Sequence, residues 1–280
     1  MIPAAFDYLR AGSADEALSL LAEHGDDAKL LAGGHSLLPL MKLRLASPAV
    51  LIDVGRLTDL SYIRDGGDHV AIGALTRHRD LERSALLGSE VPILAHVAGL
   101  VGDPQVRHRG TIGGSLAHAD PASDLPAVVL ALGGTLVARG PGGQREIPAR
   151  QFFCGFLESA LHADEMLTEI RVPKMSGGGW SYQKFNRRAI DWAIVGVAAV
   201  HDRAHGTGIA LVNMGPTPLR ATAVEEALAA GAPAAEAASA ADDATEPPSD
   251  LNAGPEYRRH LARVLVRRAL DEAGVSVAAG

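Results

Sequence analysis

Two glycine-containing segments about 80 residues apart constrain this chain more than any other feature. The first loop is Ala32-Gly33-Gly34-His35-Ser36, and the second loop is Thr111-Ile112-Gly113-Gly114-Ser115. Glycines permit positive φ angles and close approach to the backbone, and successive N–H groups beside a hydroxyl can bind an anion. Because one phosphate needs only one such loop, the pair predicts a pyrophosphate held from two sides. A dinucleotide is the natural ligand.

Neither loop matches the common nucleotide fingerprints. Gly-x-Gly-x-x-Gly is missing from both, and neither ends in the Gly-Lys-Ser/Thr of a P-loop. A Rossmann or P-loop nucleotide site is therefore disfavoured. A Gly-Gly pair alone is more often an ordinary turn, so the prediction depends on the two loops together, each preceded by a β-like stretch.

Composition indicates a globular protein rather than a nucleic-acid-binding or membrane protein. Its 280 residues predict about two domains, each with its own core, and its net charge of −7 argues against nucleic acid. The longest uncharged apolar stretch, residues 125–138, is interrupted by Pro126, Gly133 and Gly134 and is too short to span a bilayer as a helix. The N-terminus lacks the features of an export signal, so we expect a cytoplasmic protein.

The sequence contains few residues that could form a reactive or metal-binding centre. Cys154 is its only cysteine, so it can hold neither an internal disulfide nor a cysteine-ligated iron–sulfur cluster. Its apolar sequence neighbours predict that Cys154 is buried. No hydrolase motif and no compact set of metal ligands is present, so we expect no catalytic residue and no metal ligand here.

Local patterns predict a mixed α+β chain. Ser13 and Glu16 form a capping box before a helix that ends near Gly25. The expected strands are 29–31, 50–54, 70–73, 167–173, 180–185, 192–200 and 209–214, the expected helices lie near 78–87, 92–102 and 127–132, and 133–150 resembles a hairpin. Residues 229–255 have linker composition with some helical potential, and an amphipathic helix follows.

Four residues near these patterns have more than one interpretation. His35 is a polar contact to phosphate, a structural turn residue or a covalent flavin attachment point. Asp124 is a cap or turn residue, or it binds a ribose hydroxyl. Trp192 belongs either to the core or to a flat wall beside a flavin, and Lys184 either to a solvated charge cluster or to the surroundings of a cofactor or a neighbouring subunit.

Together these residues resemble a known family. The two loops, the segments Lys42-Leu43-Arg44-Leu45-Ala46 and Ala119-Asp120-Pro121, and Asp124 are similar to those of the FAD-binding medium subunits of molybdenum hydroxylases, of the carbon monoxide dehydrogenase type. The resemblance covers almost the whole chain.

The resemblance implies a fold and a site. Residues 1–175 are expected to form a two-subdomain FAD-binding fold of the vanillyl-alcohol oxidase type, with subdomains of about 1–56 and 57–175. Residues 176–280 are expected to form a smaller α+β C-terminal domain. Two loops hold the FAD pyrophosphate in that family, Asp124 would hold the adenosine ribose, and the implied noncovalent FAD site comprises Ala32, Gly33, Gly34, His35, Ser36, Thr111, Ile112, Gly113, Gly114, Ser115, Asp124, Leu167, Lys184 and Trp192.

The resemblance also implies an electron relay rather than substrate chemistry. The molybdenum cofactor would lie on a large partner and two-iron two-sulfur clusters on a small partner, in a dimer of heterotrimers. The flavin would collect two electrons for an external acceptor, namely quinone, cytochrome, oxygen or NAD. The complex would be cytoplasmic. Whether its partners attach it to the inner face of the membrane stays open. The substrate binds another chain and is not readable here.

Two alternatives stay open at this point. One is a stand-alone FAD-dependent oxidase of the same fold, with flavin linked to His35. The other is a nucleotide-binding or assembly protein without catalytic activity. Bound flavin, and its release or retention after acid precipitation, distinguishes the three.

Overall fold

The N-terminal part of the chain is a small parallel sheet with two helices. The computed structural model describes residues 2–275. Strands β1 (Asp7–Arg10), β2 (Ala28–Leu31) and β3 (Val50–Asp53) form a sheet in the order β1-β3-β2, with α1 (Ala14–His24) and α2 (Leu37–Leu43) beside it. The Ser13 hydroxyl accepts from the amide of Glu16 and starts α1, as its capping sequence predicts. The first loop connects β2 to α2.

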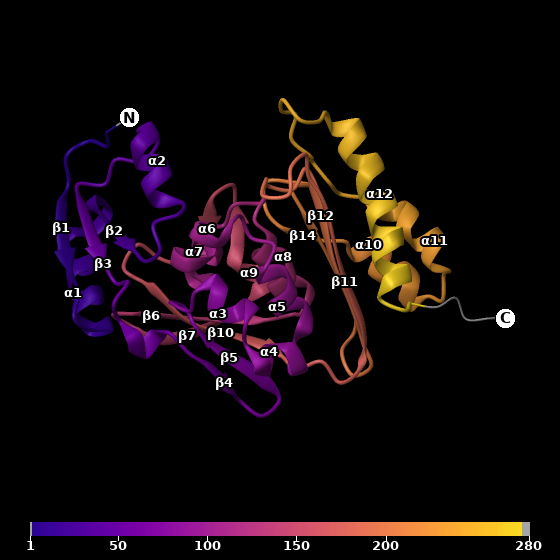
Figure 1. Cartoon of the computed structure of the whole chain (residues 1–280), viewed down its shortest axis with the longest axis horizontal. Helices are drawn as coiled ribbons and strands as arrows, with labels where there is room; N and C mark the ends of the chain where they lie inside the picture. Colours follow the sequence, from indigo (N-terminus) through magenta and orange to yellow (C-terminus); the bar gives the residue numbers. More distant parts are fainter. Residues whose placement is uncertain (1, 276–280) are drawn as a thin grey trace.

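The middle part is built on a five-stranded antiparallel sheet in the order β4-β5-β10-β6-β7. Helices cover it and carry the second loop, as Figure 1 shows. The strands are β4 (Ile63–Asp65), β5 (His69–Gly73), β6 (Thr135–Gly140), β7 (Gly143–Pro148) and β10 (Met166–Pro173), and the helices are α3 (His78–Glu82), α4 (Ala85–Glu90), α5 (Pro92–Ala98), α6 (Pro104–Arg109), α7 (Ile112–His118), α8 (Asp124–Ala131) and α9 (Ala149–Phe152).

The C-terminal part is a four-stranded antiparallel sheet backed by a long helix. Helix α12 lies against β11 and β12, on the right of Figure 1. The elements are β11 (Gly178–Phe185), β12 (Val195–Asp202), β13 (Gly206–Val212), β14 (Leu219–Arg220), α10 (Thr222–Ala229), α11 (Ala234–Ala237) and α12 (Pro255–Glu272). The remaining short elements are η1 (Gly25–Asp27), η2 (Thr58–Leu60), η3 (Ala238–Ala240), β8 (Phe153–Gly155) and β9 (Glu158–Ser159).

Helix α8 joins the middle and C-terminal parts. Every residue from Asp124 to Ala131 is buried, because α5 and α7 pack on one side of the helix and strands β12–β14 on the other. One apolar core therefore contains Val128 of α8 together with Ala198 and Val212 of the C-terminal sheet. The sequence predicts a buried helix here, but it does not predict that two expected domains share a core.

Two expectations from the sequence are wrong. The alanine-rich stretch at 229–255 is not a linker, because Ala234, Ala237 and Ala241 are buried against the C-terminal core. Alanine loses little side-chain entropy on burial and lets helices approach closely, so this composition also suits tight packing. Cys154 is exposed rather than buried, since it lies in the short strand β8 at the surface. Residues 276–280 of the expected C-terminal domain lie outside the described residues.

Candidate cofactor site

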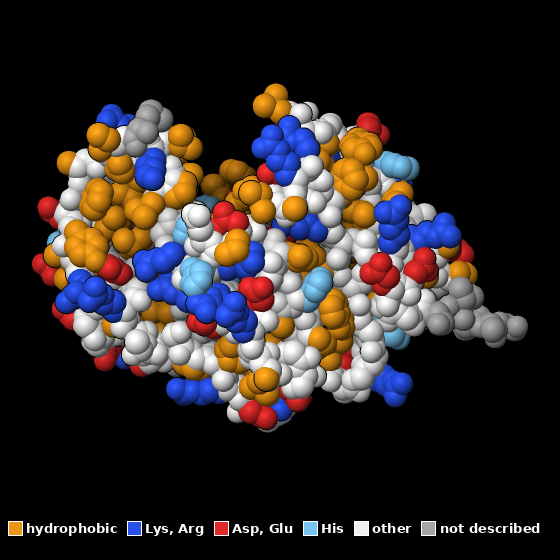
Figure 2. All heavy atoms as spheres, viewed as in Figure 1, with side chains coloured by type: hydrophobic (Ala, Val, Ile, Leu, Met, Phe, Trp, Pro, Cys, Tyr) orange, Lys and Arg blue, Asp and Glu red, His pale blue; other side chains and the backbone are white. Residues whose placement is uncertain are grey.

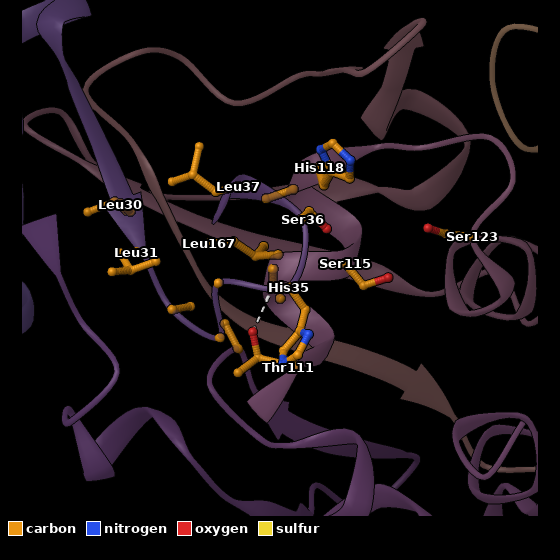
Figure 3. A pocket seen from close by; sticks show the side chains of 18 of the residues that line it. Leu30, Leu31, His35, Ser36, Leu37, Thr111, Ser115, His118, Ser123 and Leu167 are labelled. Atoms are coloured by element: carbon orange, nitrogen blue, oxygen red, sulfur yellow. Dashed lines mark hydrogen bonds between the residues drawn. The ribbon is translucent and has the colours of Figure 1, made fainter. Parts of the chain in front are cut away.

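The two glycine loops meet at one cavity. The first loop leaves β2 and the second loop opens α7, and Arg77 pairs with Thr111 in an isolated bridge. A Cβ atom on Gly33 would collide with the carbonyl oxygen of Arg109, so the first loop lies directly on the chain that leads into the second. The cavity measures about 810 Å³, within the range of about 300–1,000 Å³ typical of small-molecule sites. Figure 3 shows side chains of both loops around it.

The first loop offers backbone donors. Among residues 2–275, no acceptor is hydrogen-bonded to the amides of Gly33, Gly34, His35 or Ser36. All of these residues line the cavity. Consecutive free amides of this kind are the usual means by which a loop binds phosphate oxygens.

The second loop offers hydroxyls instead. The amides of Ile112 and Gly113 donate to the carbonyls of Thr76 and Ala74, at 3.0 and 2.9 Å. The amide of Gly114 donates to the Thr111 hydroxyl, which caps α7, at 3.1 Å. The sequence predicts two equivalent loops, but in the second loop two of these amides bind the segment that follows β5 and the third caps α7. Its contribution to the cavity is the Thr111 and Ser115 side chains.

The structure brings almost all of the expected site residues together. Ile112 is the exception, because its side chain is 0% exposed in the core of the middle part and does not line the cavity. The expected residues that do line it are Ala32, Gly33, Gly34, His35, Ser36, Thr111, Gly113, Gly114, Ser115, Asp124, Leu167, Lys184 and Trp192.

Asp124 is part of a buried cluster at one wall. Its Oδ1 atom accepts from the Tyr182 hydroxyl at 2.5 Å, and its Oδ2 atom accepts from Lys184 Nζ at 2.8 Å. Lys184 Nζ also donates to the carbonyl of Leu100 at 3.2 Å. Burial raises the pKa of Asp124, and the neighbouring Lys184 ammonium and Tyr182 hydroxyl oppose the rise. Both oxygens of the carboxylate thus already have protein donors, whereas the sequence expects a ribose partner.

Leu167 and Trp192 close other sides of the cavity. Leu167 lies in β10 beside a bulge in its pairing with β6 and is buried. Trp192 precedes β12 and is 58% exposed, so it is a wall residue and not a core residue. Asn213 donates to the Ala193 carbonyl at 2.9 Å, and Arg258 donates to the Ile194 carbonyl, so the chain just after Trp192 is fixed in place.

Basic groups lie at the edge of the two loops. The Arg77 guanidinium donates to the carbonyls of Arg109 and Gly55 and so connects the middle part to the N-terminal part. Burial, and then the Arg109 cation, lower the pKa of His35. Figure 2 shows Lys, Arg and His side chains gathered on this face, over the middle of the molecule. A bound anion would relieve the repulsion among these cations.

Lys29 and His78 are two of the cavity-lining residues that sequence reasoning did not assign to the site. Lys29 lies in β2 before the first loop, and His78 begins α3. Lys29 stands in the short run that leads into the first loop, so its position was a usable signal. No local pattern marks His78. Long-range contacts bring it to the cavity, namely the bridge between Arg77 and Thr111 and the hydrogen bond from the His78 amide to the Gly110 carbonyl.

Comparison with known proteins identifies the family. The model of the FAD binding domain in molybdopterin dehydrogenase matches residues 4–175, and the model of the CO dehydrogenase flavoprotein C-terminal domain matches residues 180–273. The chain belongs to the FAD-binding medium subunits of molybdenum hydroxylases. It is an oxidoreductase flavoprotein subunit of a complex.

Similar proteins extend over the whole chain. The carbon monoxide dehydrogenase medium chain of Hydrogenophaga pseudoflava is 45% identical over 98% of both chains. A solved structure of carbon monoxide dehydrogenase from that organism, lacking the Mo-pyranopterin moiety, matches with a TM-score of 0.95 and 44% identity over 99% of this chain and 100% of the other. Quinoline 2-oxidoreductase from Pseudomonas putida 86 matches with a TM-score of 0.90 and 31% identity over 98% and 99%.

These matches confirm the expected α+β fold, an FAD-binding part followed by a smaller C-terminal part, and FAD as the cofactor. The donor set described above fits that cofactor, since free amides and hydroxyls face each other across a cavity of suitable size. Among residues 2–275, no helix is both long enough and apolar enough to cross a membrane. Within the same range, no group of three or more candidate side chains is placed to hold a metal ion.

Proposed function

We propose that this chain holds FAD noncovalently between its two glycine loops and relays electrons within a heterotrimer that pairs as a dimer. Its partners would be a large molybdenum-cofactor subunit and a small iron–sulfur subunit, as the names and similarity of the carbon monoxide dehydrogenase relatives support. We also propose the division into an FAD-binding domain, 1–175, and a C-terminal domain, 176–280. The single observation that carries the proposal is that the two loops share one cavity with complementary donors.

Each group of residues would have a separate task at the pyrophosphate. The free amides of the first loop would donate to one phosphate, and the Thr111 and Ser115 hydroxyls would donate to the other. The backbone-to-backbone contact of Gly33 with Arg109 fixes the spacing of the loops. Preorganised donors of this kind bind an anion without reorganisation on binding.

The far wall would orient the flavin rather than react with it. Leu167 is an apolar surface against which a ring system can pack, and Trp192 offers a second, partly exposed surface. When bound, FAD supplies the capacity to accept electrons singly from iron–sulfur clusters and to deliver them to an external acceptor, for which quinone, cytochrome, oxygen and NAD are the choices to be assayed.

Asp124 and Lys184 would act mainly through each other. Both side chains are buried at the cavity wall, at 6% and 8% exposure. Because protein donors occupy both Asp124 oxygens, a ribose contact would have to share one of them. The pair therefore positions the start of α8 and the end of β11 around the cavity.

The test is a flavin titration of the purified full chain. We expect visible flavin bands after incubation with FAD, and yellow colour in the supernatant after acid precipitation. Co-expression with the two partner genes should then give one complex of all three chains by size-exclusion chromatography with light scattering. Colour retained in the pellet would indicate a His35 linkage and a stand-alone oxidase, and a chain that binds no flavin would contradict the proposal.

A further inference from the structure

His78 is a buried polar side chain at the cavity to which the proposed function assigns no role. Its exposure is 4%, and it lines the cavity. Its Nδ1 atom is enclosed and has no hydrogen-bond partner, the one such side-chain atom among the described residues. An unpaired buried polar atom costs about 1–3 kcal/mol, so the state of Nδ1 decides which ring nitrogen carries the proton.

The position of the ring is fixed by the approach to the second loop. The amide of His78 donates to the carbonyl of Gly110 at 3.1 Å. A Cβ atom on Gly110 would lie 2.6 Å from Cδ2 and 2.8 Å from Nε2 of His78, so this edge of the ring lies against the backbone just before Thr111. Any side chain at residue 110 would push the ring away from this place.

The two ring nitrogens differ in their surroundings. Nδ1 is sealed, whereas Nε2 also has no partner among the described residues but is not enclosed. A proton on Nδ1 would be a donor with no acceptor, so the proton belongs on Nε2, at the edge that remains accessible. Burial, and then His35, Arg77 and Arg107, lower the pKa of His78 to about 4. The ring is therefore a neutral donor at neutral pH.

We propose that the Nε2–H group of His78 donates a hydrogen bond to the diphosphate of the ligand held between the two loops. This inference rests on the proposed function, and it adds a third donor element beside the first-loop amides and the second-loop hydroxyls. The neutral ring contributes a directional bond and no further positive charge, in a region where His35, Arg77 and Arg109 already repel one another.

The experiment compares three substitutions in the full chain. His78→Gln places an amide donor near the position of Nε2, His78→Asn places it near Nδ1, and His78→Phe keeps the ring without any donor. His96→Phe is the matched control, because His96 packs on Trp180 with ring centroids 5.2 Å apart and does not line the cavity. Affinity is measured for FAD and for ADP, which carries the diphosphate without the flavin, and thermal unfolding is recorded for every variant.

We expect His78→Phe and His78→Asn to lower the affinities for FAD and for ADP alike, by roughly 10-fold to 100-fold. The affinities of His78→Gln should stay within about threefold of those of wild type. His96→Phe should bind both ligands as wild type does. If His78→Phe does not fold, the Gln and Asn pair decides the matter. Equal affinity of these two variants, or loss of FAD affinity without loss of ADP affinity, would overturn the inference alone. A wild-type chain that binds neither ligand would overturn the proposed function and this inference together.

Discussion

At the scale of single residues, the glycines of the two loops are required for the fold itself, independently of any ligand. A Cβ atom on Gly33 would meet the Arg109 carbonyl, and one on Gly113 would lie 2.5 Å from the Ala74 carbonyl. Each glycine therefore lets two backbone segments touch. These close backbone contacts, which leave no room for a side chain, set the distance between the two loops and so the width of the cavity.

Gly33→Ala should separate the loops. Its new methyl group must displace the backbone at Arg109, and backbone cannot move as a flexible side chain does. We expect FAD affinity to fall at least about tenfold and the free energy of unfolding to fall by about 1–3 kcal/mol. Fluorescence titration and urea unfolding measure the two effects. Gly142→Ala is the control, since a Cβ atom there meets nothing within 4 Å; equal behaviour of the two variants would contradict this account.

FAD affinity should rise as the pH falls. Burial and Arg109 hold the pKa of His35 below its usual value of about 6.5 in the free chain, Asp103 acts in the opposite sense, and a pyrophosphate beside the ring would raise it. Binding then takes up a proton, so affinity increases as the pH falls from the pKa of the bound state toward that of the free state. Titrations between pH 5.5 and 8.5 should show this slope. His35→Asn should flatten it, and an unchanged slope in that variant would be inconsistent with the assignment.

Much of the site at this scale could be predicted from sequence. Residues of both loops line one cavity together with Leu167, and the loops are local motifs that a sequence can reveal. Ile112 faces the core because it is the first residue of α7 and its side chain packs under the helix. Neither the donation of the Ile112 and Gly113 amides to distant carbonyls nor the role of Asp124 could be predicted, since their partners lie 36 or more residues away in the chain.

At the scale of elements, α8 and β11 are held to each other by charge. Asp124 is the first residue of α8, and Lys184 and Tyr182 reach it from β11. A buried ion pair adds little net stability, but removing one partner leaves an uncompensated charge. The contact thus fixes where the two elements meet more than it strengthens the fold.

Lys184→Met should destabilise the chain by about 3–5 kcal/mol, because it leaves the Asp124 carboxylate buried without its cation. Adding Asp124→Asn should restore much of the loss, since the buried charge is then gone. Urea unfolding of the two single variants and the double variant forms a double-mutant cycle. Additive effects in that cycle would show that the pair does not act as a unit.

Asp202 should make the junction near residue 176 sensitive to acid. Burial raises its pKa, but amides of His205, Ser176 and Ala204 and the Ser176 hydroxyl outweigh this and lower the pKa to about 2. A lowered pKa stabilises the fold above the unfolded-state value of about 3.9, and this stability is lost as the pH falls toward 2. The free energy of unfolding of wild type should exceed that of Asp202→Asn by about 2 kcal/mol at pH 7, and this difference should vanish near pH 2. A constant difference across that range would argue against the linkage.

At the scale of the whole molecule, the boundary near residue 176 separates two family models but not two cores. The core of the middle part includes Tyr182, Ala198 and Val212 from beyond the boundary. Sequence patterns predict most of the strands and helices, because periodicity is local, and they predict the boundary from the glycine run at 177–179. They cannot predict that α8 packs against strands that are more than 60 residues further along.

A fragment ending at residue 175 should not fold on its own. It would expose the face of α8 that β12–β14 cover, and it would leave Asp124 without Lys184 and Tyr182. We expect an aggregated or partly unfolded product, checked by size-exclusion chromatography and circular dichroism. Co-expression with a fragment of 176–280 should restore a folded pair. A monomeric, cooperatively unfolding fragment would contradict the shared core.

The contact of Arg258 with the Ile194 carbonyl has a consequence for the order of events in the cell. Arg258 is fully buried in α12 and pairs with Asp250, so α12 is needed to fix the segment that follows Trp192. Synthesis proceeds from the N-terminus, and the loops emerge from the ribosome long before α12 does. The cavity wall beside Trp192 is therefore completed only after α12 has emerged, well after both glycine loops have left the ribosome.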